Sequence, residues 1–386
     1  MDDPIVIVGA GHAGAQAAIA LRQRQYTGRI LLLGDEPDAP YERPPLSKEY
    51  LAGERPLERL ALRSPSFWAS KDIALMPGRR VVAVDPAARR LTLADGDSIP
   101  YGRLIWAAGG APRRLTCPGA DLFGIHVIRT RADVDGLRGD LHAARHVLIV
   151  GGGYIGLEAA AVLVKLGHAV TLVEAQDRLL ARVAAPDLSR LLAERHRAAG
   201  IDLRLGVTVA GLSGIDGRVA LAHLSDGTDL PVDLAIVGIG IVPVVGPLRD
   251  AGAEGSNGVD VDSDCRTSLP GILAIGDCAA RVNPFADGRR LRVESVQNAM
   301  EQAMLAACAL TGHPPPPATV PTFWSNQYEL KIQTAGLSLG HHATEMRRTA
   351  DGQGTVLTYL RGGRIIAADC VNAPRDFMAL KSAIIG

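Results

Sequence analysis

The chain has 386 residues, a length that predicts two or three domains. Hydrophobic residues make up 47% and charged residues 21%, so a large core is possible and a wholly disordered chain is excluded. Lys and Arg total 41, and Asp and Glu also total 41. This balance argues against a nucleic-acid-binding protein that works through bulk positive charge.

The cysteines give no sign of a disulfide framework, a zinc site or a dithiol redox pair. Their number is odd and no two have C-x-x-C spacing. They are Cys117, Cys265, Cys278, Cys308 and Cys370. The N-terminus has no signal-peptide pattern, and the longest uncharged apolar stretch (234–248) is too short and too broken to span a bilayer. We therefore expect a cytoplasmic protein without a metal site or membrane partner.

The chain opens with a strand, a glycine-rich turn and a helix. The apolar residues 5–8 lead into Gly9-Ala10-Gly11-His12-Ala13-Gly14, and a small-residue helix is expected over 15–24. A second strand, expected over 29–33, is followed by Asp35-Glu36. This order of elements, with G-x-G-x-x-G spacing, is the dinucleotide-binding pattern.

The same pattern occurs a second time. Apolar residues 147–150 lead into Gly151-Gly152-Gly153-Tyr154-Ile155-Gly156, and a helix is expected over 157–166. The next strand, expected over 169–173, ends at Glu174. In each copy the glycines allow a tight turn, the approach of a pyrophosphate and close packing of helix on strand. The helix N-terminus supplies N–H groups and a positive dipole end. Two such units predict an α/β protein with two Rossmann-like domains, in which a flavin exchanges electrons with a nicotinamide.

Further elements are expected between and after these units. Beyond the Pro-rich linker at 313–317, the chain is expected to form a small α+β domain. The expected elements are paired strands within 79–93 with a turn at Asp95-Gly96, strands at 104–108 and 234–241, a helix over 296–310, strands at 329–334, 355–360 and 364–369, and a helix over 374–384.

The whole layout resembles the oxygenase-coupled NADH:ferredoxin reductases of the glutathione reductase superfamily, the branch of putidaredoxin reductase, biphenyl dioxygenase reductase and rubredoxin reductase. Three motifs carry the resemblance: 41–48 (YERPPLSK), 293–299 (VESVQNA) and 323–328 (FWSNQY). The resemblance covers essentially the full chain. It implies a discontinuous FAD-binding domain (1–109 and 241–317), an NADH-binding domain (110–240) and a C-terminal α+β domain (318–386).

The resemblance also implies which residues hold FAD. The helix after Glu294 would direct its N-terminus to the pyrimidine end of the flavin, where the dipole favours the reduced form. Ala108 stands where the family commonly has Thr, which removes a hydroxyl near FAD. The implied FAD contacts are Gly9, Gly11, His12, Ala13, Gly14, Asp35, Glu36, Arg43, Lys48, Val82, Ala108, Gly109, Arg113, Gly276, Asp277, Glu294, Ser295, Val296 and Trp324.

Three residues are implied as catalytic: Lys48, Glu158 and Trp324. Lys48 is one of only five lysines, and the family pattern pairs it with Glu158 beside the reactive ring, where an ammonium stabilises negative charge. The alternative is a surface lysine in a Pro-bounded turn. For Trp324 the family position is next to the flavin, and the alternative is ordinary core packing.

For the nicotinamide, Glu174 favours NADH over NADPH, because a carboxylate accepts from both ribose hydroxyls and repels a 2′-phosphate. Arg178 and Arg182 could soften that repulsion, or could lie on a solvated helix face. The implied NADH contacts are Gly151, Gly153, Tyr154, Ile155, Gly156, Glu158, Glu174, Arg182, Ile239 and Gly240.

The region 41–51 contains no cysteine, which disfavours a dithiol substrate, and Cys278 is expected to be a small buried residue. Without a thiol relay, electrons would leave the flavin directly. The resemblance implies that they pass singly to an iron–sulfur cluster on a separate [2Fe–2S] ferredoxin serving an oxygenase or cytochrome P450. Arg289, Arg290 and Arg292 could steer that partner or be solvated surface. A rubredoxin reductase, or a redox-responsive binding protein like the apoptosis-inducing factors, remains an alternative. We expect a monomer or weak homodimer that binds no nucleic acid.

Overall fold

The structure is a computed structural model that describes residues 3–385. The described chain forms two compact units. Unit 1 takes in the chain up to Glu42, then Glu58–Ala111 and Pro243–Phe323, and unit 2 takes in Arg43–Leu57, Pro112–Val242 and the chain from Trp324 onward. Each unit contains one of the two glycine-rich turns. None of the helices within residues 3–385 is long and apolar enough to cross a membrane.

Unit 1 is built on a parallel sheet. Its elements are β1 (Ile5–Val8), α1 (His12–Gln23), β2 (Ile30–Leu33), α2 (Pro65–Ser70), β3 (Ile73–Met76), β4 (Val81–Asp85), β5 (Arg90–Leu93), β6 (Ser98–Pro100), β7 (Arg103–Trp106), α6 (Gly246–Asp250), β18 (Val259–Val261), β19 (Ile272–Ala274), η3 (Gly276–Cys278), β20 (Ala279–Asn283), η4 (Pro284–Ala286), β21 (Arg289–Leu291) and α7 (Val296–Thr311). The main sheet has the order β19-β7-β1-β2-β3, with β1 in the middle. Every residue of β1 and β2 is buried, as expected for parallel strands covered on both faces.

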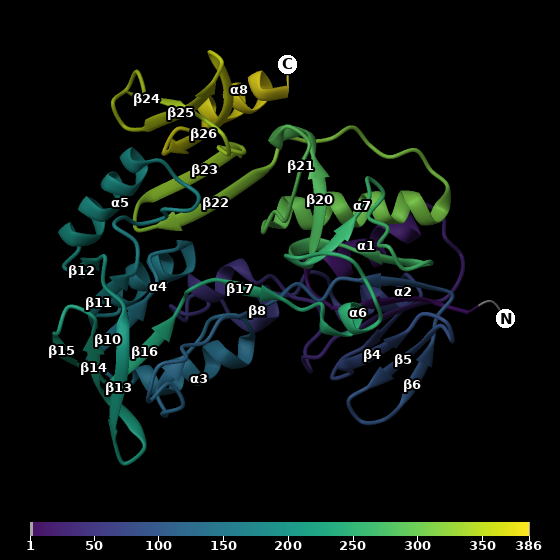
Figure 1. Cartoon of the computed structure of the whole chain (residues 1–386), viewed down its shortest axis with the longest axis horizontal. Helices are drawn as coiled ribbons and strands as arrows, with labels where there is room; N and C mark the ends of the chain where they lie inside the picture. The colour runs from purple at the N-terminus through teal and green to yellow at the C-terminus, as the bar shows by residue number, and fades with distance from the viewer. Residues whose placement is uncertain (1–2, 386) are drawn as a thin grey trace. The chain divides into compact units, whose positions relative to one another are not determined.

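Two helices of unit 1 lie side by side although about 270 residues separate them in the chain. Figure 1 shows α7 alongside α1, and the two helices pack closely. Their shared core is rich in alanine, including Ala15 and Ala18 of α1 and Ala303 and Ala307 of α7. Small side chains let the helix backbones approach. This packing places the start of α7 and the glycine turn before α1 in the same unit.

Unit 2 repeats the parallel architecture and adds a C-terminal sheet. Its elements are η1 (Pro44–Ser47), β9 (Ile125–His126), α3 (Arg131–Leu141), β10 (His146–Val150), α4 (Tyr154–Lys165), β11 (Ala169–Glu174), α5 (Pro186–Ala198), β12 (Asp202–Leu205), β13 (Val209–Ile215), β14 (Arg218–Leu224), β15 (Asp229–Pro231), β16 (Leu234–Val237), β23 (Leu330–Gly336), β24 (Ala343–Arg348), β25 (Thr355–Arg361), β26 (Arg364–Val371) and α8 (Pro374–Ile385). The parallel sheet has the order β12-β11-β10-β16-β9. The remaining elements lie at the borders of the units: η2 (Leu57–Arg59), β8 (Gly110–Pro112), β17 (Ile241–Pro243) and β22 (Thr322–Gln327).

The C-terminal part of unit 2 is an antiparallel sheet in the order β22-β23-β26-β25-β24, and α8 packs on β23 and β26 (Figure 1). Strands β22 and β24 are additions to the predicted elements. Most of β24 is exposed, so it lacks the alternation of buried and exposed residues that marks a half-buried strand.

Both helices after the glycine turns begin three residues earlier than predicted. α1 starts at His12 with Gly11 as its N-cap, and α4 starts at Tyr154 with Gly153 as its N-cap. The predicted starts, residues 15 and 157, come after the third glycine of each motif. In the structure that third glycine is part of the first helical turn, because close packing of the helix on its strand requires the missing side chain.

Candidate functional site

The glycine turn of unit 1 has the geometry that a bound pyrophosphate requires. Gly9 has a φ of +108°, and a Cβ there would lie 2.3 Å from the carbonyl oxygen of Ala107. A Cβ at Gly14 would lie 1.9 Å from the carbonyl oxygen of Gly9. Helix α1 begins without a side-chain cap and without an acidic residue in its first turn. An uncapped, uncharged helix N-terminus at the carboxyl end of a parallel strand is a general anion-binding arrangement.

A second turn of unit 1 lies against the first. Gly276 of η3 has a φ of +77°, and a Cβ there would lie 3.0 Å from Cβ of Ala13. The backbone N–H of Gly276 donates to Oε1 of buried Gln302 at 2.7 Å. The structure therefore brings the predicted residues of the first glycine turn together with Gly276-Asp277.

Gln302 and Asn298 support this turn, although neither is among the predicted site residues. Nε2 of Gln302 donates to Oδ1 of Asn298 at 3.3 Å, and Nδ2 of Asn298 donates to the carbonyl oxygen of Val293 at 2.8 Å. These bonds link η3 to the 293–295 loop through α7. The signal in the sequence is a pair of amides four residues apart on the buried, alanine-rich face of a helix.

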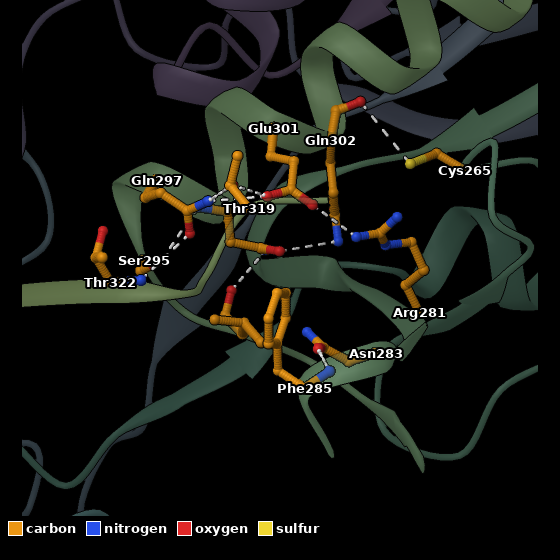
Figure 2. A network of polar contacts seen from close by, with 12 residues as sticks. Cys265, Arg281, Asn283, Phe285, Ser295, Gln297, Glu301, Gln302, Thr319 and Thr322 are labelled. Carbon is orange, nitrogen blue, oxygen red and sulfur yellow. Dashed lines mark hydrogen bonds and ion pairs between the residues drawn. The ribbon is translucent and has the colours of Figure 1, made fainter. Parts of the chain in front are cut away.

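Figure 2 shows polar contacts that tie the segment after the Pro-rich linker, at Thr319 and Thr322, to helix α7. Ser295 caps α7 by accepting from the N–H of Asn298 at 3.1 Å. Gln297 donates to Glu301 and to Thr319, at 2.9 and 2.6 Å, and Arg281 donates to the other carboxylate oxygen of Glu301 at 2.8 Å. Val296 is the first residue of the helix. The segment after the Pro-rich linker is therefore anchored to α7 at Thr319.

The other predicted FAD contacts of unit 1 differ in how far they are buried. Glu36 is half-buried and accepts from the hydroxyl of Tyr41 at 2.6 Å, while Asp35 is exposed at the same strand end. Gly109 has a φ of +65° beside Ala108, which packs on the core. The side chain of Val82 is 43% exposed on β4.

The three arginines considered for partner steering have different surroundings. Arg292 is 9% exposed; it donates to the carbonyl oxygen of Asp277 at 2.5 Å and pairs with Glu294 at 2.9 Å. Arg290 donates to the carbonyl oxygen of Val261 at 2.6 Å. Arg289 is exposed. The interpretation of Arg292 as a steering or solvated residue is therefore wrong, because its guanidinium is buried and holds the backbone of η3.

We therefore expect Arg289→Ala and Arg292→Ala to act differently. Arg292→Ala should destabilise the protein by about 1–3 kcal/mol, because it leaves the half-buried carbonyl of Asp277 without its charged donor. Arg289→Ala should leave stability within about 0.5 kcal/mol. Urea unfolding of both variants checks this. Equal loss of stability in the two variants would contradict the assignment of Arg292 to the backbone of η3 and of Arg289 to the exposed surface.

The glycine turn of unit 2 repeats the geometry of the first. A Cβ at Gly151 would lie 2.5 Å from the carbonyl oxygen of Gly238, and one at Gly156 would lie 2.1 Å from the carbonyl oxygen of Gly151. A Cβ at Gly153 would meet nothing closer than 3.9 Å, so the backbone is open there. Helix α4 begins without a side-chain cap, and Ile155 in its first turn is 40% exposed.

Glu174 lies at this turn, as the strand-end pattern predicts. Its Oε2 accepts from the N–H of Gly152 at 2.5 Å, and its Oε1 accepts from the N–H of Gln176 at 2.8 Å. The carboxylate is therefore held at the carboxyl end of β11, beside the glycines, where a ribose would be recognised.

Arg178 is a structural residue and does not lie on a helix face. Its guanidinium donates to the carbonyl oxygens of Ala181 and Ala184, at 2.9 and 2.7 Å, and to Oγ of Ser189 at 2.9 Å. The interpretation of Arg178 as part of a solvated helix face is therefore wrong, and its effect on a 2′-phosphate stays a prediction. Its donors are engaged in shaping the turn at 177–184, where the predicted helix face is absent.

Arg182 extends from that turn toward another predicted residue. A Cβ at Gly240, whose φ is +96°, would lie 3.4 Å from a guanidinium nitrogen of Arg182. The carbonyl oxygen of Gly240 accepts from the N–H of Arg113 at 2.9 Å, while the Arg113 side chain is exposed. Ile239 is partly buried against the core of the unit. Arg182, Gly240 and the backbone of Arg113 are therefore neighbours.

Lys48 and Glu158 form a buried ion pair, with Nζ and Oε2 2.7 Å apart. Their side chains are 12% and 5% exposed. Two hydroxyls complete the cluster: Ser47 donates to Oε2 of Glu158 at 2.6 Å and Ser325 to Oε1 at 2.7 Å. The surface-lysine interpretation of Lys48 is therefore wrong, since Ser47 of η1, the following Lys48 and Ser325 of β22 all donate to one carboxylate of α4.

Arg43 and Trp324 flank this cluster in sequence. Arg43 donates to the carbonyl oxygen of Arg129 at 2.6 Å. Trp324 precedes Ser325 on β22 and is 39% exposed. Successive residues of a strand point to opposite faces, so a buried Ser325 places Trp324 on the other side. Core packing therefore does not describe Trp324.

The cysteines provide no thiol relay. All five are free; four are buried and Cys117 is half-buried. Burial raises the pKa of the Cys278 thiol to about 12, so it stays protonated and unreactive at neutral pH. Within residues 3–385 there is no group of three His, Cys, Asp or Glu residues arranged to hold a metal ion.

Comparison with known proteins identifies the class to which this fold and these turns belong. Residues 3–303 match the pyridine nucleotide-disulphide oxidoreductase family, and residues 322–385 match the reductase C-terminal family. The chain belongs to the pyridine nucleotide-disulphide oxidoreductase family.

Its relatives are reductases. The chain is 52% identical to the ferredoxin reductase subunit of 5,5′-dehydrodivanillate O-demethylase from Sphingobium sp. strain SYK-6, with 98% of this chain and 92% of that one covered. It is 53% identical to a ferredoxin–NAD(P)+ reductase from Sphingomonas sp., with the same coverage. Among solved structures, the covalent putidaredoxin reductase–putidaredoxin complex matches with a TM-score of 0.95 at 39% identity, over 99% of this chain and 93% of that one. The predicted family, fold class and enzyme class are confirmed.

The cofactors of this family are FAD and NAD(H), and the residues fit them. In each unit a positive-φ glycine, an uncapped helix and a carboxylate at the next strand end are present together. The residues predicted for FAD divide between unit 1 and the segments of unit 2 that hold Arg43, Lys48, Arg113 and Trp324. Those predicted for NADH lie in unit 2.

Proposed function

We propose that this protein takes a hydride from NADH and passes the electrons singly to a [2Fe–2S] ferredoxin that serves an oxygenase or a cytochrome P450. Bound FAD would supply the conversion of one two-electron transfer into two one-electron transfers. The observation that carries the proposal is the presence of two dinucleotide-binding turns in a chain whose thiol beside the Gly276-Asp277 turn, Cys278, is buried and protonated. Without a thiol relay, electrons leave directly for an external acceptor.

The proposal assigns the domains and residues as the family pattern does. Residues 1–109 and 241–317 would hold FAD, 110–240 would hold NADH, and 318–386 would form the C-terminal domain. We propose that Lys48 stabilises negative charge on the flavin and that Glu158 holds its ammonium in place, as the 2.7 Å ion pair supports. Trp324, exposed on its strand, would contact the flavin or the partner. We further propose a monomer or weak homodimer acting in the cytoplasm.

Cytochrome c reduction tests the proposed function. The holoenzyme is assayed with NADH, with and without added [2Fe–2S] ferredoxins, and with NADPH as the control. Strong stimulation by a ferredoxin, with NADH preferred, is the expected result. If only rubredoxin stimulates the reaction, rubredoxin is the partner in place of ferredoxin. If NADH reduces the flavin quickly but every carrier reoxidises it slowly, a redox-responsive binding protein is favoured.

The preference for NADH is expected to depend on Glu174. Glu174→Gln should lower the ratio of kcat/KM for NADH over NADPH by about 10- to 100-fold, because the neutral amide no longer repels a 2′-phosphate. Glutamine keeps an oxygen that can accept from the N–H of Gly152, so the turn should persist. Steady-state ferricyanide reduction with both nucleotides checks this.

Arg182 is the cation most able to modify that preference. Arg182→Ala in the Glu174→Gln background should reverse part of the gain in kcat/KM for NADPH. The guanidinium of Arg182 lies by Gly240, a predicted NADH contact in the same unit, and its positive charge would attract a 2′-phosphate. An unchanged nucleotide ratio in Glu174→Gln would show that this carboxylate does not select the nucleotide.

A further inference from the structure

A buried carboxylate lies in the C-terminal sheet, outside every predicted site. Asp369 of β26 is 2% exposed. Its Oδ1 accepts from Oγ1 of Thr334 and its Oδ2 accepts from the hydroxyl of Tyr359, both at 2.5 Å. Burial raises the pKa of Asp369 above its ordinary value. A buried acid of this kind is costly, and each of its hydroxyl donors is joined to a further group.

The hydroxyl of Thr334 connects Asp369 with the glycine turn of unit 2, the proposed NADH site. Thr334 also hydrogen bonds with the side chain of Tyr154, the first residue of α4. Thr334 gives its own proton to Asp369, so one hydroxyl contacts both the carboxylate and the Tyr154 side chain. Burial and the nearby Asp369 raise the pKa of Tyr154 well above its ordinary value, so its hydroxyl stays protonated and can donate. The phenol of Tyr154 is thus tied to the buried carboxylate.

The hydroxyl of Tyr359 connects Asp369 with the end of the turn that contains Arg182. The oxygen of Tyr359 accepts from the N–H of Ala185 at 2.9 Å, and Ala185 is the N-cap of α5. The turn before it contacts the glycine motif, since Leu180 N–H donates to the carbonyl oxygen of Gly152 at 3.1 Å. Asp369 therefore connects the start of α4 with the far end of the turn that follows Glu174.

We propose that Asp369 is a positioning residue for NAD(H): through Thr334 and Tyr359 it holds Tyr154 and the 176–185 turn in the arrangement that binds the dinucleotide. The inference rests on the proposed function, because it concerns the same NADH site. It gives the C-terminal sheet a part in nucleotide binding. Precise placement of binding groups depends on a second layer of hydrogen bonds that locks their orientation.

The test compares the FAD-loaded wild type with Asp369→Asn, Thr334→Val and Tyr154→Phe. Steady-state ferricyanide reduction gives KM for NADH and kcat, and calorimetry gives Kd for NAD+. Asp369→Asn and Thr334→Val should each raise KM and Kd about 5- to 30-fold and leave kcat within about twofold. Thr358→Val is the matched control, because Thr358 lies in the same sheet and makes one long hydrogen bond, 3.4 Å, to Glu345. It should change neither constant.

A double variant separates positioning from general loosening. In a Tyr154→Phe background, Thr334→Val should add less than a twofold further rise in KM, because the hydroxyl it serves is already gone. Rises that multiply independently, or an unchanged KM and Kd in folded Asp369→Asn and Thr334→Val, would overturn the proposal. If Asp369→Asn does not fold, the Thr334 and Tyr154 variants decide the question. A wild type that binds NAD+ but never oxidises NADH would refute the proposed function alone, and the calorimetric comparison would still decide this inference.

Discussion

Lys48→Met is expected to lower the free energy of unfolding by about 3–5 kcal/mol, because it leaves Glu158 buried without its cation. The two serine hydroxyls that remain on the carboxylate are neutral donors and cannot replace an ammonium. Methionine approximates the volume of the lysine stem, so packing loss contributes little. Urea unfolding of the holoenzyme, followed by circular dichroism, measures the change.

Unit 2 offers a matched control for this experiment. Lys165 pairs with Glu54 on the surface, where the two side chains are 66% and 48% exposed. Lys165→Met should change stability by no more than about 1 kcal/mol, because solvent screens exposed pairs. Equal effects of the two substitutions would mean that the Lys48–Glu158 pair is not buried in solution.

Lys48→Met is also expected to slow flavin reduction by NADH about 100-fold or more, following the role proposed for the ammonium. Stopped-flow absorbance on FAD-loaded protein measures this rate separately from stability. Lys48→Arg should restore part of the stability, since it keeps the charge, but little of the rate, because a planar guanidinium does not reproduce a compact ammonium. A normal reduction rate in folded Lys48→Met would remove Lys48 from the catalytic residues.

Gly14→Ala and Gly156→Ala are expected to disable the two dinucleotide sites one at a time. The added methyl would lie 1.9 Å from the carbonyl oxygen of Gly9 in the first case and 2.1 Å from that of Gly151 in the second. Because the clashing atom is backbone, the helix must move off its strand, at a cost of about 1–3 kcal/mol or more. Gly14→Ala should purify with little FAD. Gly156→Ala should keep its FAD but show a KM for NADH at least tenfold higher.

FAD content by absorbance and KM by ferricyanide reduction separate the two outcomes. Gly136→Ala in α3 is the control, because a Cβ there meets nothing within 4 Å. Alanine is the better helix former, so this control should be as stable as the wild type or slightly more stable. Loss of FAD from Gly156→Ala with retention in Gly14→Ala would reverse the assignment of the two turns.

Much of this protein follows from local patterns in its sequence. The two glycine turns, their flanking strands and the carboxylates at Glu36 and Glu174 could be predicted because each lies within about 30 residues of chain. The backbone of each turn permits only glycine at its strained positions, so the residue identity reports the conformation directly. The motif at 41–48 likewise allowed Lys48 to be paired with Glu158 through family resemblance, and the structure brings them together.

The tertiary structure alone decided which polar side chains serve those turns. Gln302 reaches Gly276 only because α7 packs against η3, and Asp369 reaches Tyr154 through Thr334 only because the C-terminal sheet packs in the same unit as α4. Arg292 and Arg178 look like ordinary surface arginines in sequence, yet Arg292 donates to one backbone carbonyl and Arg178 to two. Such contacts join residues far apart in the chain or depend on an irregular turn. An arginine or a polar side chain can equally lie on the solvated surface or hold a backbone group, so its type does not decide between these roles. Periodicity and spacing describe local conformation, whereas the partner of a buried polar group is set by the packing of distant elements.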